Sequence, residues 1–527
     1  MSSSWIFRGL LLLFAGLTAG LLWANDIPLG VPGEWVWSRR DRNAELAIAI
    51  VLGIFTGAVY CVWAWWGAGR IGAVGRARRV MWVAGLFCAT VGLWWSLLGW
   101  IPGVTGIVRV PWVLYFPGSS GYFTQAQRDV ADPREFLRTY QQRVTEAEGM
   151  DRYLHLGTHP PGLTLAFHGL RSLCLHSPGL VRAVEATEPA GVREAFDAIQ
   201  STAPPGAGPT APDRAALWLG WLLVLGGTAL GGPALYGLAR RRLSPAAAWR
   251  VGALWPLVPA VLVFLPKSDA LFGGLAPLLA WLWFSAVDRN SWTRAVLFGL
   301  VLYGSLLLSL AFLPVALLIA VASLVELFEE GIDPHALEPE SDPLPVRGGT
   351  ISRLAATAQC VGVALAGFVL PLAVLWSWAG YNTVAVALQN LRNHAEFYQH
   401  SPRTYLPWLG VNAAELALSA GLPLSLAALA SLLSGPHVRR LVRPQLCAFL
   451  VVWGILWLSG KNMGEAARLW CFLLAWPTFL AGMAFAAPEG PDEDRSRRDW
   501  TWLLGTQMLA CVVTVFVITG FEFGLLQ

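Results

Sequence analysis

Several short polar segments carry candidate catalytic and binding residues, and the first of these segments is 117–135. Asp129 and Asp132 are three residues apart, so a continuous helix would place both carboxylates on one face. Two neighbouring carboxylates can serve as general base and hydrogen-bond acceptor for an attacking hydroxyl group. The structural alternative is that Asp132, which precedes Pro133, caps a helix or forms a turn, with Asp129 as a surface charge.

Two histidines, His155 and His159, follow in the same part of the chain. Their i, i+4 spacing would suit metal ligation on a helix, but a glycine and two prolines interrupt 155–162. No acidic or cysteine ligand follows at a usual spacing, so the sequence assigns no metal ligand and leaves a divalent metal open. The other interpretations are hydrogen bonding to a phosphate or sugar hydroxyl, and a turn stiffened by proline.

Charged residues also lie close to the apolar runs. Lys267 and Asp269 occupy a very short connection between two such runs, where charges are costly unless they are paired or used. They could pair with one another, or Lys267 could face a lipid phosphate as a compact point charge. In the segment 461–468, Glu465 and Arg468 are i, i+3 apart and could pair along one helix face.

Arginine suits bidentate recognition of phosphate, whereas a single arginine at a membrane edge more often extends to the lipid headgroups. Because several cationic segments are expected on the same side of the membrane, we predict that they contribute to one site. The candidate substrate-binding residues are His155, Lys267, Asp269, Arg392, His394, Arg403, Glu465 and Arg468, and the candidate catalytic residues are Asp129, Asp132 and His159.

The composition identifies the kind of protein that must position these residues. Of 527 residues, 55% are hydrophobic and 13% are charged, about half the charged fraction of a soluble domain. We therefore predict an all-α polytopic membrane protein. The net charge is only +4, and no basic stripe with interleaved aromatic residues is present, so no nucleic-acid partner is expected.

About 20 apolar residues cross the hydrocarbon layer of a bilayer. Runs of this kind predict about thirteen transmembrane helices: 5–23, 44–66, 80–101, 215–239, 246–265, 269–287, 293–310, 312–328, 354–377, 408–433, 444–459, 467–487 and 500–521. The stretch 160–176 is shorter and contains His168 and Arg171, so we expect it to lie on the membrane.

The basic residues favour an N-in, C-out orientation. The arginine clusters at 76–79, 240–242, 439–443 and 495–498 then all fall on the cytoplasmic side, as the positive-inside rule requires. The predicted regions are a three-span region 1–101, an extracytoplasmic loop 102–214 with interfacial helices, core spans 215–327, a cytoplasmic loop 328–353, and C-terminal spans 354–527 with outer loops 378–407 and 460–467. The candidate site would face the extracytoplasmic side of a plasma (inner) membrane.

Within 80–327, four strings together resemble the GT-C superfamily of membrane glycosyltransferases, which includes protein O-mannosyltransferases and lipid A aminoarabinose transferases. They are GYFTQA at 121–126, HPPG at 159–162, LYGLARRRL at 235–243 and KSDAL at 267–271. The resemblance implies transfer of a sugar from a polyprenyl-phosphate donor to a lipid, glycan or protein acceptor, with membrane lipids as the surroundings. It also implies a catalytic carboxylate just before the Gly-Tyr pair.

At that position this chain has Ser119-Ser120 instead of an acidic residue. The base would then have moved to Asp129 or Asp132, with Asp269 as the next candidate, or activity would be lost. Two other function classes therefore stay open: a catalytically inactive GT-C-like binding or scaffold protein, and a transporter or ligase of lipid-linked glycans. A transporter would need polar residues deep in its spans, where this sequence has few.

Overall fold

A computed structural model describes residues 2–146, 157–204, 208–328, 350–400, 403–486 and 491–521. These residues are almost entirely helical. The one small sheet in the described part is a hairpin of β1 (Gly30–Val31) and β2 (Trp35–Val36), paired antiparallel. The all-α class predicted from composition is therefore confirmed.

Eight helical stretches of the described chain are long and apolar enough to cross a membrane. They are α1 (Ser2–Trp23), α2 (Ala44–Arg70), α3 (Arg76–Trp100), α11 (Ala211–Ala229) continuing into α12 (Gly231–Ala239), α15 (Asp269–Arg289), α18 (Thr350–Ala379), α22 (Pro436–Leu458) and α25 (Pro491–Val517). The helices α20 (Tyr405–Ala420) and α21 (Leu422–Leu432) form a ninth candidate bent by 100°.

The other predicted spans are short or broken in the structure. The helices α16 (Trp292–Leu308) and α17 (Phe312–Phe328) are apolar, but each has fewer than 18 residues. The run 246–265 is divided into α13 (Pro245–Gly252), a 3-10 turn and α14 (Pro259–Phe264). The run 467–487 is likewise divided into α23 (Ala466–Leu469), a 3-10 turn and α24 (Ala475–Met483). The count of thirteen spans stays a prediction.

Exposed apolar stripes show which surfaces would meet lipid. On α2, Val51, Phe55, Val59 and Val62 lie at helical spacing and are each more than half exposed. Such a continuous apolar stripe is unfavourable in water but matches the hydrocarbon of a bilayer. The surface therefore agrees with a multi-pass membrane protein.

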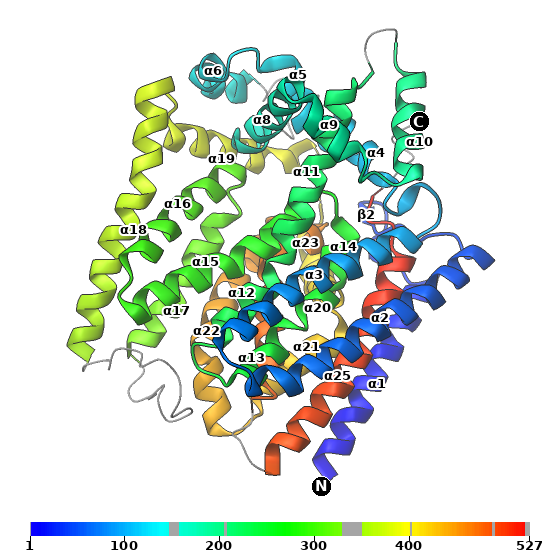
Figure 1. Ribbon diagram of the computed structural model, residues 1–527, viewed down its shortest axis with the longest axis vertical. Helices are drawn as coiled ribbons and strands as arrows, with labels where there is room; N and C mark the ends of the chain where they lie inside the picture. Colours follow the sequence, from blue (N-terminus) through cyan, green and yellow to red (C-terminus); the bar gives the residue numbers. More distant parts are fainter. Residues whose placement is uncertain are drawn as a thin grey trace.

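Short helices lie together across one end of the bundle, at the top of Figure 1. They are α4 (Arg109–Tyr115), α5 (Tyr122–Asp129), α6 (Pro133–Glu146), α8 (Gly162–His176), α9 (Pro178–Glu185) and α10 (Ala190–Thr202). We call this the loop end; the N-terminus lies at the opposite end, which we call the N-terminal end. The stretch 160–176, expected to lie on the membrane, forms α8 among these helices.

Candidate functional site

An arginine and two carboxylates meet at the side of the bundle where α15 begins. Nη1 of Arg468 lies 2.8 Å from Oε1 of Glu465, and its Nη2 donates to Oε2 at 3.1 Å, so the pair is bidentate. Nε of Arg468 lies 3.7 Å from Oδ2 of Asp269. This Nε atom is buried and has no hydrogen-bond partner among the described residues. The Nε side of the guanidinium therefore faces Asp269 at ion-pair distance without a hydrogen bond.

The turn before α23 positions this arginine. Three of its residues, Asn462, Gly464 and Glu465, have positive φ angles of 62°, 80° and 56°. A left-handed backbone is uncommon outside glycine and is kept only where surrounding contacts impose it. A side chain at Gly464 would lie 2.9 Å from Nη1 of Arg403, so glycine there lets Arg403 approach the turn.

Lys267 lies beside the same group of charges. Burial of its ammonium lowers the pKa of Lys267 to about 8, and the nearby positive charge of Arg468 acts in the same direction. The ammonium also lies 5.7 Å from the ring centroid of Phe521, and the Arg109 guanidinium lies 5.3 Å from that centroid. A lysine with this pKa is partly deprotonated near pH 8, so it can both attract an anion and donate a proton.

Tyr122 completes the group from the loop end. Gly121, with φ of 76°, makes the left-handed turn that begins α5, and Tyr122 is buried behind it. Burial, together with the nearby Asp269 carboxylate, raises the pKa of the Tyr122 hydroxyl well above its usual value. Tyr122, Lys267, Asp269, Glu465 and Arg468 are called the Arg468 cluster below.

His159 borders the Arg468 cluster through Tyr122. The two rings meet edge to face with their centroids 5.8 Å apart. The His159 carbonyl accepts hydrogen bonds from the Tyr140 hydroxyl at 2.9 Å and from Nδ2 of Asn390 at 3.2 Å. Burial lowers the pKa of His394, and the neighbouring His159 contributes to the same shift. His159 and His394 therefore lie near each other, beside the cluster.

The other predicted residues lie elsewhere. Asp132 caps α6, because its Oδ1 accepts from the Arg134 backbone N–H at 2.9 Å. Asp129 ends α5, about 10 Å along the helix axis from Tyr122. Arg392 is exposed, and His155 falls outside the described residues. The structural alternative for Asp132 is thus observed, while a catalytic role for either aspartate stays a prediction.

Arg403 belongs to a neighbouring contact with the β1–β2 hairpin. Its guanidinium lies 5.6 Å from the ring centroid of Trp408. The Glu34 carboxylate accepts from the Thr404 hydroxyl at 2.6 Å and from Nε1 of Trp408 at 2.7 Å. The Thr404 hydrogen bond is the largest cause of a lowered Glu34 pKa, and the Arg403 charge adds to it.

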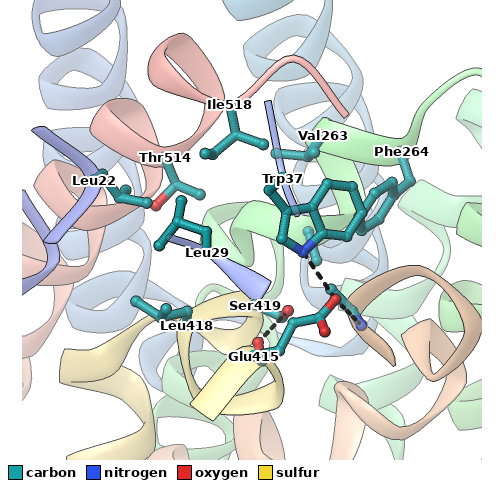
Figure 2. Close-up of a pocket in the computed structure, with 12 residues that line it drawn as sticks. Leu22, Leu29, Trp37, Val263, Phe264, Glu415, Leu418, Ser419, Thr514 and Ile518 are labelled. Carbon is teal, nitrogen blue, oxygen red and sulfur yellow. Dashed lines mark hydrogen bonds between the residues drawn. The ribbon is translucent and has the colours of Figure 1, made fainter. Parts of the chain in front are cut away.

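Sequence reasoning missed a buried carboxylate beneath the cluster. Oε1 of Glu415 accepts from Nε1 of Trp37 at 2.9 Å and from the Ala467 backbone N–H at 3.0 Å. Glu415 lines a small, mostly apolar cavity of about 50 Å³. Figure 2 shows its side chain next to those of Trp37 and Ser419. Because Ala467 precedes Arg468, Glu415 fixes the helix that presents the arginine. The sequence does contain a signal that could have identified Glu415, because it is a lone acidic residue inside the predicted span 408–433.

Two amides on α19 (Thr383–His400) were also missed. Asn390 donates to the Gly157 carbonyl at 2.7 Å, and Asn393 donates to the Val144 and Gly157 carbonyls at 2.9 and 3.0 Å. Both side chains are fully buried and three residues apart on one helix face. They hold α6 and the segment leading to His159 against α19.

The Arg468 cluster brings charges of both signs together. Two cations and two carboxylates stand in one partly buried cluster, where charge interactions are stronger than in open water. The described residues contain no group of three or more His, Cys, Asp or Glu side chains that could hold a metal ion. The chain matches no known protein-family model, and no curated protein is significantly similar to it.

Proposed function

We propose that this protein is a membrane glycosyltransferase of the GT-C type, which transfers a sugar from a polyprenyl-phosphate donor to an acceptor at the extracytoplasmic face. The observation that carries the proposal is the meeting of Lys267, Asp269 and Arg468 at the beginning of a span. A donor that is held in the bilayer by its polyprenyl chain would bring its phosphate to this level.

In this proposal the cations bind the donor phosphate. When the bond between the sugar and the phosphate oxygen breaks, negative charge develops on that oxygen. Lys267 and the Nε side of Arg468 would stabilise this charge, and a partly buried, preorganised cluster does so more effectively than water. Glu465 would hold the Arg468 guanidinium in the orientation that this requires.

A carboxylate must accept the proton of the acceptor hydroxyl as its oxygen bonds to the sugar. Asp269 is our first candidate, because it lies within the cluster and belongs to the first turn of α15. Asp129 and Asp132 stay as the predicted alternatives. Tyr122 is placed to contact either the donor phosphate or the acceptor, since it neighbours both Asp269 and Arg468.

The experiment is a transfer assay on protein reconstituted in lipid nanodiscs. A panel of polyprenyl-phosphate sugars is supplied with membrane lipid extract as the acceptor, and the release of free polyprenyl phosphate is measured. We expect release that depends on the acceptor and is lost in Asp269→Asn. An Arg439→Gln variant, exposed at the opposite end of the bundle, is the matched control and should retain activity. No release with any donor would contradict transfer.

A binding or scaffold relative is the second candidate, and two observations favour it. Asp132 serves as a helix cap, and the position before Gly121 is the buried Ser120 instead of an acid. Such a protein would bind the donor without consuming it. Donor binding measured in the same nanodiscs therefore separates the two: binding without release supports the scaffold, and binding with release supports the transferase.

A further inference from the structure

A second cavity, of about 480 Å³, opens at the N-terminal end of the bundle, away from the Arg468 cluster. Its walls come from the beginnings of α3 and α16, from α12 and the turn after it, and from the second half of α15. Its size falls in the range of cavities that hold small ligands. Nothing in the proposed transfer reaction uses it.

One part of this cavity is strongly basic. Among the described residues that line it are the six arginines Arg76, Arg79, Arg240, Arg241, Arg289 and Arg294, against the single carboxylate of Asp288. We call it the arginine pocket. Asp288 is engaged by Arg241, with Nε 2.5 Å from Oδ2, and Glu326 also pairs with Arg241 at 3.0 Å. The charge of the lining is therefore strongly positive.

The other part of the arginine pocket is apolar. Pro233 and Ala234 line it from α12, together with Leu230 just before that helix, and Leu278 lines it from α15. From Gly231 to Ala239, α12 rises by about 12 Å, and Arg240 and Arg241 follow its end, so the pocket changes from apolar to basic along its length. Leucine at 230 is 38% exposed at the surface, which leaves the apolar part open to surrounding lipid.

An aromatic wall joins the two parts. Trp281 lines the pocket, and the Arg294 guanidinium lies 6.0 Å from the centroid of its ring. A side chain added at Gly237 would lie 2.5 Å from Nε1 of Trp281. Glycine at 237 therefore lets the indole pack directly against α12 and keeps the pocket at its present shape.

The arginine pocket matches a ligand that has an anionic part and an apolar part. A small soluble anion would leave the apolar walls unfilled, and a lipid without net negative charge would leave the excess positive charge of the lining uncompensated. Arginine is well matched to phosphate, which it binds through paired N–H groups. We propose that the arginine pocket binds a membrane phospholipid with an anionic phosphate headgroup, with the phosphate at the arginines and an acyl chain along Leu230 and Leu278.

The test is a lipid titration of the full-length detergent-solubilised protein, followed by native mass spectrometry. The probes are phosphatidylglycerol, zwitterionic phosphatidylcholine and water-soluble glycerol 3-phosphate. The pocket variant is Arg289→Gln/Arg294→Gln, which spares the Arg241 ion pairs. The control is Arg78→Gln/Arg439→Gln, which removes the same charge from exposed arginines that do not line the pocket. A third variant, Leu278→Trp, narrows the apolar part.

We expect one phosphatidylglycerol to bind, with affinity reduced about tenfold or more in the pocket variant and unchanged in the control. Leu278→Trp should weaken the binding of phosphatidylglycerol. Glycerol 3-phosphate should bind poorly to the wild type and to every variant. Equal losses in the pocket variant and the control would overturn the proposal, since binding would then follow net charge. Equal binding of phosphatidylcholine, or tight binding of glycerol 3-phosphate alone, would also overturn it. Thermal unfolding confirms that each variant is folded.

Discussion

The side chains of Arg468 and Asp269 meet where α15 begins, with Nε of the arginine 3.7 Å from Oδ2 of the aspartate. Asp269 lies in the first turn of α15 and Arg468 at the end of α23, two elements far apart in the chain. Their contact brings a possible proton acceptor next to a possible phosphate-binding group. The first predictions separate these two roles.

Replacing Arg468 by Gln should weaken donor binding about tenfold or more. A hydrogen bond to a charged group contributes about 1.5–3 kcal/mol, and each 1.4 kcal/mol is tenfold in affinity. Arg468→Lys should recover only part of the loss, because lysine keeps the charge but not the planar fork. A donor-binding assay in nanodiscs measures this, with Glu465→Gln in the same series. Unchanged affinity in Arg468→Gln would make Arg468 a structural anchor.

Replacing Asp269 by Asn should abolish transfer while leaving donor binding within a few-fold of the wild type. The amide keeps the size of the side chain but cannot accept the acceptor's proton at neutral pH. Asp132→Asn should retain activity, because Asn and Asp cap helices about equally well. Turnover and donor affinity are measured on both variants and on Asp129→Asn. Loss of turnover in Asp129→Asn or Asp132→Asn alone would place the base there.

Donor binding should weaken as the pH rises through about 8. Burial lowers the pKa of Lys267 to about 8, so the ammonium is charged below that pH and neutral above it. A neutral amine no longer attracts the donor phosphate. Binding isotherms between pH 6.5 and 9.5 test this. Lys267→Arg should remove the pH dependence of donor binding, since arginine stays charged throughout this pH range. An unchanged pH profile in Lys267→Arg would assign the pH dependence to another group.

Removing the Glu415 carboxylate should destabilise the protein and disturb Arg468. In Glu415→Ala, the Trp37 indole N–H and the Ala467 N–H lose their acceptor, and an unsatisfied buried donor costs about 1–3 kcal/mol. Glu415→Gln keeps an acceptor oxygen and should therefore lose less stability than Glu415→Ala. Thermal unfolding in detergent gives the order of stability. A Glu415→Ala protein as stable as the wild type would show that these hydrogen bonds are not needed.

Single-cysteine labelling should show that the two ends of the bundle lie on opposite sides of the membrane. Ser201, at the loop end, and Ala77, at the N-terminal end, are both exposed and suited to the probe. With N-in, C-out orientation, an impermeant thiol reagent added to intact cells labels Ser201→Cys and not Ala77→Cys. The native Cys88 is exposed and must be replaced first. If the reagent labelled Ala77→Cys and not Ser201→Cys, the orientation would be the reverse of the predicted one.

The tertiary structure was needed to select among the candidate residues. Lys267, Asp269, Glu465 and Arg468 were each recognisable from the sequence, because charges beside apolar runs are costly and therefore informative. Contacts between distant segments bring these four residues together with Tyr122, whereas Asp132 lies elsewhere and caps a helix. The departures at 246–265 and 467–487 have a similar origin: composition gives enough apolar residues for a span, but prolines at 256 and 259 divide the first of them into short helices.

Composition and hydropathy were enough to predict the all-α class and the positions of the helices long and apolar enough to cross a membrane, because the transfer of apolar residues into hydrocarbon is a local, additive property of each run. The sequence also supplied the strings that resemble GT-C glycosyltransferases. Contacts between distant segments were needed to find that Glu415 supports α23 and that Asn390 and Asn393 hold the segment before His159. The same holds for the arginines in or next to α3, α12, α15 and α16 that line one cavity. Hydrogen bonds and charge clusters of this kind join residues that no local pattern relates, so packing of the whole chain determines them.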